Sequence, residues 1–233
     1  MGKLLDIIKD MMKSLRFIIP LLFIFGVIFA FYTLFTRNDA EKTVDDIIYI
    51  TRKVREDRQE TYFKDFNNDT VVYSNFLPID LRSRMTDKGY IIKNRFGSIM
   101  TFKESYKTKE EKDFYMSIKN DPIVFERAYR GTGAYTITFY GIRRSACMLL
   151  AQTDWKKKVP NFLGISVGRI NRSDPRIGTE KLDLGLLYGL TEIDYDGPDD
   201  RSFVSNRKLQ YREAFKACRC LLHNKCVVSL KFM

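Results

Sequence analysis

The side chains best suited to chemistry are four cysteines and a single histidine. Cys147 stands apart, whereas Cys218, Cys220 and Cys226 form a C-x-C-x5-C cluster that encloses His223. Structural zinc sites more often use C-x2-C or H-x3-H spacings, so disulfide bonds are the favoured interpretation and zinc is the alternative. The sequence therefore predicts one or two disulfides, with no bound metal and no cofactor.

The histidine decides whether the common nucleophilic mechanisms are open to this chain. Because His223 is the only histidine, any Ser-His-Asp or Cys-His mechanism would depend on it. It lies in a turn-like segment before the last strand, where a surface histidine is the favoured interpretation. The chain also lacks a phosphate-binding loop, a dinucleotide-binding glycine motif and the H-E-x-x-H zinc motif. We therefore expect no catalytic residues and no enzyme activity.

Two groups of charged residues could bind ligands. Asp194, Asp196, Asp199 and Asp200 could surround a cation, but they lack the order of an EF-hand, and a solvated acidic loop is favoured. The basic residues form clusters at 52–58, 156–158 and 169–176. A solvated surface is the favoured interpretation of these clusters, and nucleic acid is the alternative. The residues that would contact nucleic acid are Lys156, Lys157, Lys158, Arg169 and Arg172.

The net charge does not decide between these partners. The chain has 40 Lys and Arg against 29 Asp and Glu, a formal charge of +11. The basic residues are spread along the chain, which permits contact with nucleic acid or anionic lipid and establishes neither.

An uncharged segment near the N-terminus predicts a membrane anchor. Residues 17–36 contain no charged side chain, and about 20 such residues cross a hydrocarbon core as a helix. Lys and Arg precede the segment and Asp and Glu follow it, which predicts a cytoplasmic N-terminus and a C-terminal domain outside the inner membrane. Phe17 and Phe35 lie near the ends of this span, and Pro20 and Gly26 inside it could bend it. We expect a cytoplasmic amphipathic arm at 1–16, the transmembrane helix at 17–36 and one extracytoplasmic domain at 37–233.

The elements of that domain follow from hydrophobic spacing. Apolar residues from Ala40 to Val54 recur at helical intervals, so the helix should continue to about Arg58 with one face that needs a partner. Apolar and β-branched runs predict strands at 98–102, 135–140, 163–170 and 226–232, and a short helix at 143–155. Residues 103–130 and 171–210 are expected to be polar connections.

Two segments of the domain resemble the type IVb pilins, which include conjugative pilins and toxin-coregulated pilin. Residues 66–78 (FNNDTVVYSNFLP) and 92–102 (IKNRFGSIMTF) resemble the segment and strand entry that follow the long helix in that family. Residues 135–139 (YTITF), followed by Cys147, Leu150 and a strand near 165–167, resemble its central strand and cysteine-bearing helix.

The resemblance implies a fold, a pairing of the cysteines in disulfides and a structural role for the chain. The fold is α+β, with a long N-terminal helix packed on an antiparallel sheet of about four strands, as in type IV pilins. The implied disulfide joins Cys147 to Cys220, with Cys218 and Cys226 as a possible second pair. The implied role is a structural subunit of a pilus or related secretion assembly, with other pilins and platform proteins as partners.

The N-terminus departs from the family pattern. Gly2 is followed by Lys3, and no glutamate stands at the fifth position after that glycine. We therefore expect prepilin peptidase to cut this chain poorly. The alternative function is a non-polymerising, membrane-anchored protein that binds pilus or secretion components or extracellular DNA.

Overall fold

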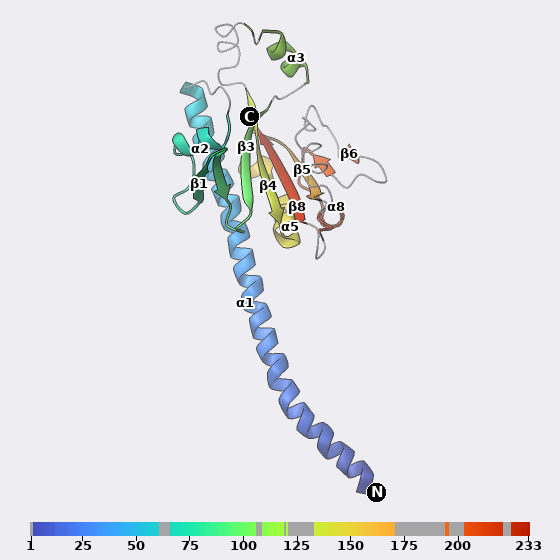
Figure 1. Cartoon of the computed structure of the whole chain (residues 1–233). Coiled ribbons are helices and arrows are strands. Elements are labelled where there is room, and N and C mark those ends of the chain that lie inside the picture. The colour runs from blue at the N-terminus through green and yellow to red at the C-terminus, as the bar shows by residue number, and fades with distance from the viewer. Residues whose placement is uncertain are drawn as a thin grey trace. The chain divides into compact units, whose positions relative to one another are not determined.

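The longest element of the protein is a helix, α1 (Gly2–Glu60), which tolerates Pro20 in its interior. The computed structural model describes residues 2–60, 66–105, 109–118, 120, 133–170, 194–195, 203–220 and 225–233. Within α1, side chains are described at positions 18–28, 30 and 38–57. The chain forms two compact units, Met1–Asp39 and Ala40–Met233, and α1 contributes to both (Figure 1).

The second unit is built on one antiparallel sheet whose strand order is β1-β2-β3-β4-β8-β5-β7-β6. Its strands are β1 (Arg82–Thr86), β2 (Gly89–Lys93), β3 (Ile99–Ser105), β4 (Ala134–Ile142), β5 (Phe162–Ile170), β6 (Asp194–Tyr195), β7 (Phe203–Ser205) and β8 (Lys225–Phe232). The strand nearest the C-terminus, β8, pairs with both β4 and β5 and so lies in the middle of the sheet. The last part of the sequence is therefore needed to complete the core.

The described part of the chain also contains five shorter helices: α2 (Asn68–Tyr73), α3 (Lys109–Ile118), α5 (Arg144–Gln152), α6 (Trp155–Lys158) and α8 (Tyr211–Ala217). The Asn67 side chain caps α2 by accepting hydrogen bonds from the amides of Asp69 and Thr70. The carboxylate of Asp69 in turn accepts a 2.7 Å hydrogen bond from the amide of Tyr90 on β2. Gly89 beside it has φ +100°, and a Cβ there would lie 2.8 Å from that carboxylate, so only glycine fits.

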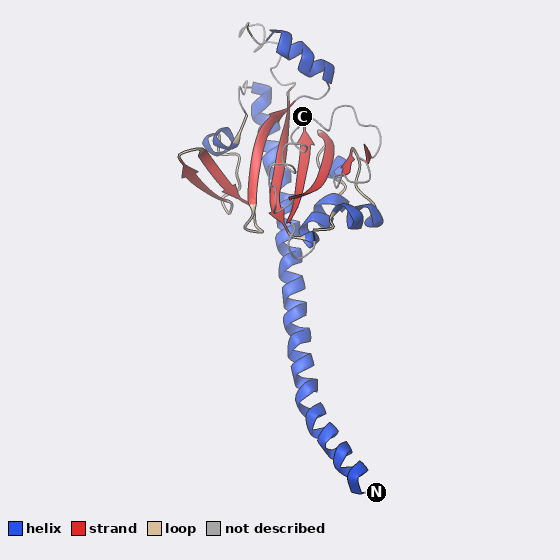
Figure 2. Ribbon diagram, turned by 45° about the vertical axis from the view of Figure 1, so that its right-hand side comes forward, coloured by secondary structure: helices blue, strands red, loops and turns tan. Residues whose placement is uncertain are grey.

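The core forms where the second part of α1 packs on one face of the sheet (Figure 2). Val44, Ile47, Ile50 and Val54 are buried at three- and four-residue intervals, which places them on one side of the helix. Alternate residues of the central strands face the same core. These are Tyr135, Ile137 and Phe139 of β4, Ile165 and Val167 of β5, and Val228, Leu230 and Phe232 of β8.

The other face of the central strands carries a buried polar row. Thr138, Ser166 and Ser229 are cross-strand neighbours, and all three are buried. The hydroxyls of Thr138 and Ser229 lie 2.9 Å apart and share a hydrogen bond. Lys231, two residues beyond Ser229 on β8, is only 1% exposed. Both faces of the middle of the sheet are therefore closed to solvent.

The fold class and the localisation expected from the sequence need correction. The sheet has eight strands where about four were expected, so the type IV pilin-like α+β fold is not supported. Among the residues that the structure describes, no helix combines the length and apolar character needed to cross a membrane. The expected inner-membrane, single-pass localisation is therefore also not supported.

Individual elements agree better with the sequence. Strands are present at each of the four expected positions, as β3, β4, β5 and β8, and the helix expected at 143–155 is α5 followed by α6. The expected polar connections proved to contain α3, β6 and β7, and the β1–β2 hairpin was not expected at all.

A partly buried ion pair fastens α1 to the β2–β3 turn. Arg95 donates from Nε to Asp46 Oδ2 at 2.6 Å and from Nη2 to Asp46 Oδ1 at 2.8 Å. The hydrogen bonds to Asp46 raise the pKa of Arg95 above its ordinary value, although burial opposes them. Such a two-pronged pair between largely buried groups fixes the rotation of α1 about its axis.

We expect Asp46→Ala to lower the free energy of unfolding by about 2 to 3 kcal/mol, because it leaves Arg95 without its main acceptor. The cost should stay below that of a fully buried pair because Asp80 Oδ2, 3.4 Å from Arg95 Nη2, remains. Asp45→Ala is the matched control, since the neighbouring carboxylate is exposed and should change stability by less than about 0.5 kcal/mol. Urea unfolding of the two variants measures the difference, and equal costs would show that the pair does not fasten the helix.

Candidate functional site

A small groove in the second unit brings together two basic segments that are far apart in the sequence. One wall comes from α1 and the other from the end of α6 and the turn into β5. The groove has a volume of about 110 Å³ and is lined by Ile48, Thr51, Arg52, Arg55, Lys158, Val159, Pro160 and Asn161. Three cations thus surround a largely aliphatic depression.

The three cations of the groove are exposed. Arg52, Arg55 and Lys158 form no ion pair with any other described residue, in contrast to the neighbouring lysines. Lys53 lies 3.4 Å from Glu56, and Lys157 lies 3.5 Å from Asp154. These three cations are therefore available to a ligand.

The α1 wall is set by helix periodicity. Arg52 and Arg55 are three residues apart, so they lie on the same side of the helix. The Arg52 guanidinium lies 5.8 Å from the centre of the Tyr49 ring, a cation–π contact that orients it. Ile48 packs against the core from the edge of the buried stripe, which brings this side of the helix close to the sheet.

The opposite wall is held by a buried tryptophan. Trp155, the first residue of α6, donates its indole N–H to the carbonyl of Leu150 at 2.8 Å and packs against Phe162 and Phe232. The amide of Val159 then donates to the Trp155 carbonyl at 2.7 Å. This arrangement ends α6 after one turn and directs Lys158 toward the groove.

The turn into β5 is closed by the last residue of the sequence. The amide of Met233 donates to the Asn161 carbonyl at 2.9 Å, and the Asn161 side-chain amide donates to the Met233 carbonyl. The groove is thus bounded by hydrogen-bonded backbone on one side and by a packed helix on the other.

The structure describes only some of the residues expected to contact nucleic acid. Lys156, Lys157 and Lys158 are exposed on α6, whereas the Arg169 side chain and Arg172 lie outside the described residues. The structure brings Lys158 to Arg52 and Arg55 instead. Their spacing on one helical face was visible in the sequence, but their closeness to Lys158 depends on the fold.

The expected disulfide pairing was wrong, although the expectation that Cys147 bonds to a C-terminal cysteine is confirmed. Cys147 is joined to Cys218, with a Cα–Cα distance of 5.8 Å, and Cys220 is joined to Cys226, at 5.4 Å. Cys218 is the residue that caps the C-terminal end of α8. Because α8 packs against α5, Cys218 lies next to Cys147 on α5. In addition, the amide of Leu209 donates to the Ala151 carbonyl at 2.8 Å, which holds the start of α8 against the end of α5.

The two disulfides differ in what they enclose. The Cys147–Cys218 bond closes 71 residues of sequence, and the chain-entropy relation gives a stabilisation on the order of 4 kcal/mol for it. The Cys220–Cys226 bond closes 6 residues and is worth about 2 kcal/mol on the same basis. The sulfurs of Cys147, Cys220 and Cys226 lie within 4.8 Å of one another, but the disulfides occupy them.

The structure describes only some of the other residues that the sequence analysis singled out. His223, Asp196, Asp199 and Asp200 lie outside the described residues, and Asp194 belongs to β6. Phe17 and Phe35 are helical, but their side chains lie outside the described part. Pro20 is exposed, and a Cβ built on Gly26 would meet nothing within 4 Å.

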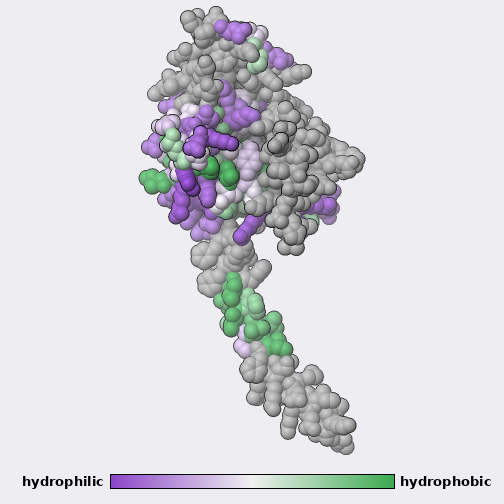
Figure 3. Space-filling view, viewed as in Figure 1, coloured by the Kyte–Doolittle hydropathy of each residue, from purple (hydrophilic) through white to green (hydrophobic). Residues whose placement is uncertain are grey.

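The first unit presents a continuous apolar surface on α1, shown in green in Figure 3. We call this set the apolar segment. Its exposed large side chains are Ile18, Ile19, Leu21, Leu22, Phe23, Ile24, Phe25, Val27 and Ile28. Phe23 is 72% exposed and Leu22 is 63% exposed.

Comparison with known proteins gives no identification. No protein family, no curated protein and no solved structure matches this chain.

The pKa of Lys231, which is buried on the polar face of the central strands, is shifted from its ordinary value. Burial lowers the pKa of Lys231 to about 8, and the negative charge of Glu111 on α3 opposes this shift. An unfolded lysine titrates near 10.4. Between about pH 8 and pH 10 the unfolded chain therefore holds a proton that the folded chain has released. Stability rises with pH wherever the unfolded state binds more protons than the folded state. The free energy of unfolding therefore increases as the pH is raised from about 8 to about 10.

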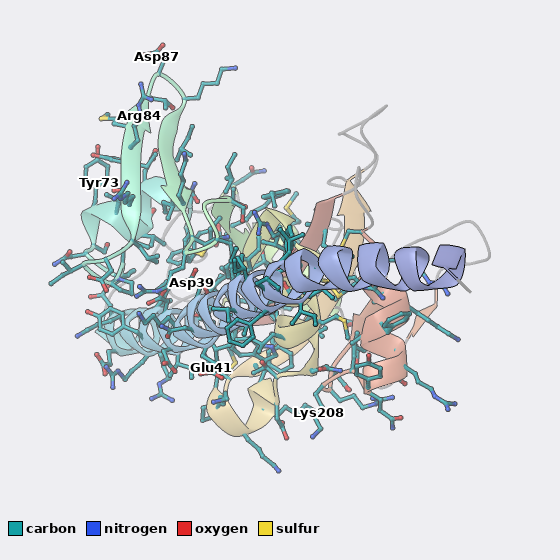
Figure 4. All side chains as sticks on the ribbon, turned by 90° about the horizontal axis from the view of Figure 1, so that it is seen from below. Asp39, Glu41, Tyr73, Arg84, Asp87 and Lys208 are labelled. Carbon is teal, nitrogen blue, oxygen red and sulfur yellow. A yellow bond between two sulfur atoms is a disulfide. The ribbon has the colours of Figure 1, made fainter. Side chains whose placement is uncertain are left out.

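We expect Lys231→Met to raise the free energy of unfolding at pH 7 by on the order of 3 kcal/mol, because the charged amine no longer has to be buried. The gain over wild type should shrink as the pH is raised from 8 to 10. Urea unfolding at a series of pH values measures it. Lys208→Met, at an exposed position labelled in Figure 4, is the control and should show no such trend. A pH-independent gain would show that Lys231 does not titrate as described.

Proposed function

We propose that this chain is a structural, non-enzymatic subunit of a multi-protein assembly, and that copies of it contact one another through the apolar segment of α1. The observation that carries the proposal is the exposure of large apolar side chains throughout residues 18–28. A surface helix normally carries its apolar residues on one side only, and a helix that is apolar all round is a buried helix.

The energetics favour association of such segments. Burying one Leu, Ile or Phe side chain contributes roughly 1.5 to 3 kcal/mol. Association costs an estimated 4 to 15 kcal/mol in lost translational and rotational freedom. Burial of six of the nine side chains would contribute roughly 9 to 18 kcal/mol, which is comparable to that cost or larger over most of its range.

The finer version of this proposal is a subunit of a pilus or a related secretion assembly, with other subunits and assembly proteins as partners. The sequence resemblance at residues 66–102 and 135–167 supports this version. The two disulfides are consistent with it because disulfides persist where thiols are oxidised, as in extracellular assemblies.

Photo-crosslinking in the producing cells tests the proposal. A photoreactive amino acid replaces Phe23 in the full chain, and mass spectrometry identifies the peptides joined to it. We expect crosslinks to α1 of a second copy. Introducing Leu22→Glu together with Phe25→Glu should reduce their yield at least tenfold, because paired carboxylates cannot be buried between apolar helices.

The control variant makes the same kind of apolar-to-glutamate substitution in the second unit. Ile79→Glu with Met85→Glu also replaces two exposed apolar residues and should leave the crosslinks unchanged. Crosslinks from position 23 that reach no copy of this chain would contradict the proposal.

A further inference from the structure

We propose that the basic groove between α1 and the α6–β5 turn docks an acidic peptide segment of a partner protein. One aliphatic side chain of the segment fills the groove, and flanking carboxylates bind Arg52, Arg55 and Lys158. This site lies in the second unit, away from the apolar segment in the sequence. The docking proposal can therefore be tested independently of the proposed self-association.

The size of the groove argues for a side chain rather than a small-molecule ligand. Sites for drug-sized ligands have volumes of roughly 300 to 1,000 Å³. The groove has about 110 Å³, and its apolar lining comes from Ile48, Val159 and Pro160. A depression of this size and character accepts a single aliphatic side chain.

The charges around the groove argue for carboxylates. Arg52 and Arg55 are like charges on one side of α1, and Lys158 adds a third cation from the opposite wall. Like charges at this helical spacing destabilise one another, so an anion placed between them relieves a repulsion. The guanidinium groups also present the fork that binds a carboxylate with two hydrogen bonds, and both arginines are exposed and available for it.

The lining disfavours nucleic acid as the occupant. Proteins that bind single strands combine a basic surface with aromatic rings on which bases stack. Among the residues that the structure describes, no aromatic side chain lines this groove, and the ring of Tyr49 is partly buried and lies under Arg52. An aliphatic depression between cations matches an acidic peptide with an apolar residue better than it matches a base and a phosphate.

Fluorescence anisotropy of the full chain tests the proposal. The probe is a fluorescein-labelled heptapeptide with a central leucine and three glutamates on each side. We expect saturable binding, and Arg55→Ala with Lys158→Ala should weaken it at least tenfold. Replacing the central leucine by serine should weaken it at least fivefold, because the groove then loses its anchor. Arg55→Lys should weaken the binding less than the double alanine variant does, because it keeps the charge and loses only the fork that binds a carboxylate with two hydrogen bonds.

The matched control removes two arginines elsewhere. Arg82→Ala with Arg84→Ala changes the net charge by the same amount on the β1–β2 hairpin, where Figure 4 labels Arg84, and should alter the affinity less than twofold. Near-ultraviolet circular dichroism of Trp155, buried beside the turn, verifies that each variant is folded.

Three results would overturn the proposal. Equal losses in the groove and hairpin variants would indicate unspecific attraction to net charge. Equal affinity for the leucine and serine peptides would leave the apolar depression without a role. A labelled oligothymidylate of the same charge that binds more tightly, and loses affinity in the groove variant, would identify the site as a nucleic-acid contact.

Discussion

The structure depends on the packing of one stripe of α1 against one face of the sheet. Val44, Ile47, Ile50 and Val54 are each 5% exposed or less, and they meet the core face of the central strands. At about 1.5 to 3 kcal/mol for each buried side chain, this contact is among the largest single contributions to the core. The Asp46–Arg95 pair then fixes the helix about its axis. Without that rotation, the groove would lose its α1 wall.

The same helix therefore has separate roles along its length. Residues 44–54 belong to the core of the second unit, and residues 18–28 expose apolar side chains from the first. Around the buried stripe, Arg52 and Arg55 remain exposed and face the turn that Trp155 holds in place. The Cys147–Cys218 bond joins α5 to the end of α8 and lies in the same core that the α1 stripe enters.

Sequence patterns predicted the elements that bury a face and failed where burial is weak or pairing is long-range. The α1 stripe and strands β3, β4, β5 and β8 carry clear periodicity. In β1 most side chains are exposed, so alternation gives no signal there. Cys218 and Cys220 are two residues apart, and only the position of α8 against α5 selects between them. The basic clusters were visible in the sequence, but roughly a hundred residues separate the two walls of the groove.

Hydrogen exchange along α1 tests the central claim most directly. In the isolated chain, amides from 44 to 54 should exchange only by global unfolding, because they belong to the core, whereas those from 18 to 28 should exchange much faster. On assembly, the second set should become strongly protected while the first changes little. Equal protection of both segments in the isolated chain, or no added protection at 18–28 in the assembly, would contradict this division of the helix.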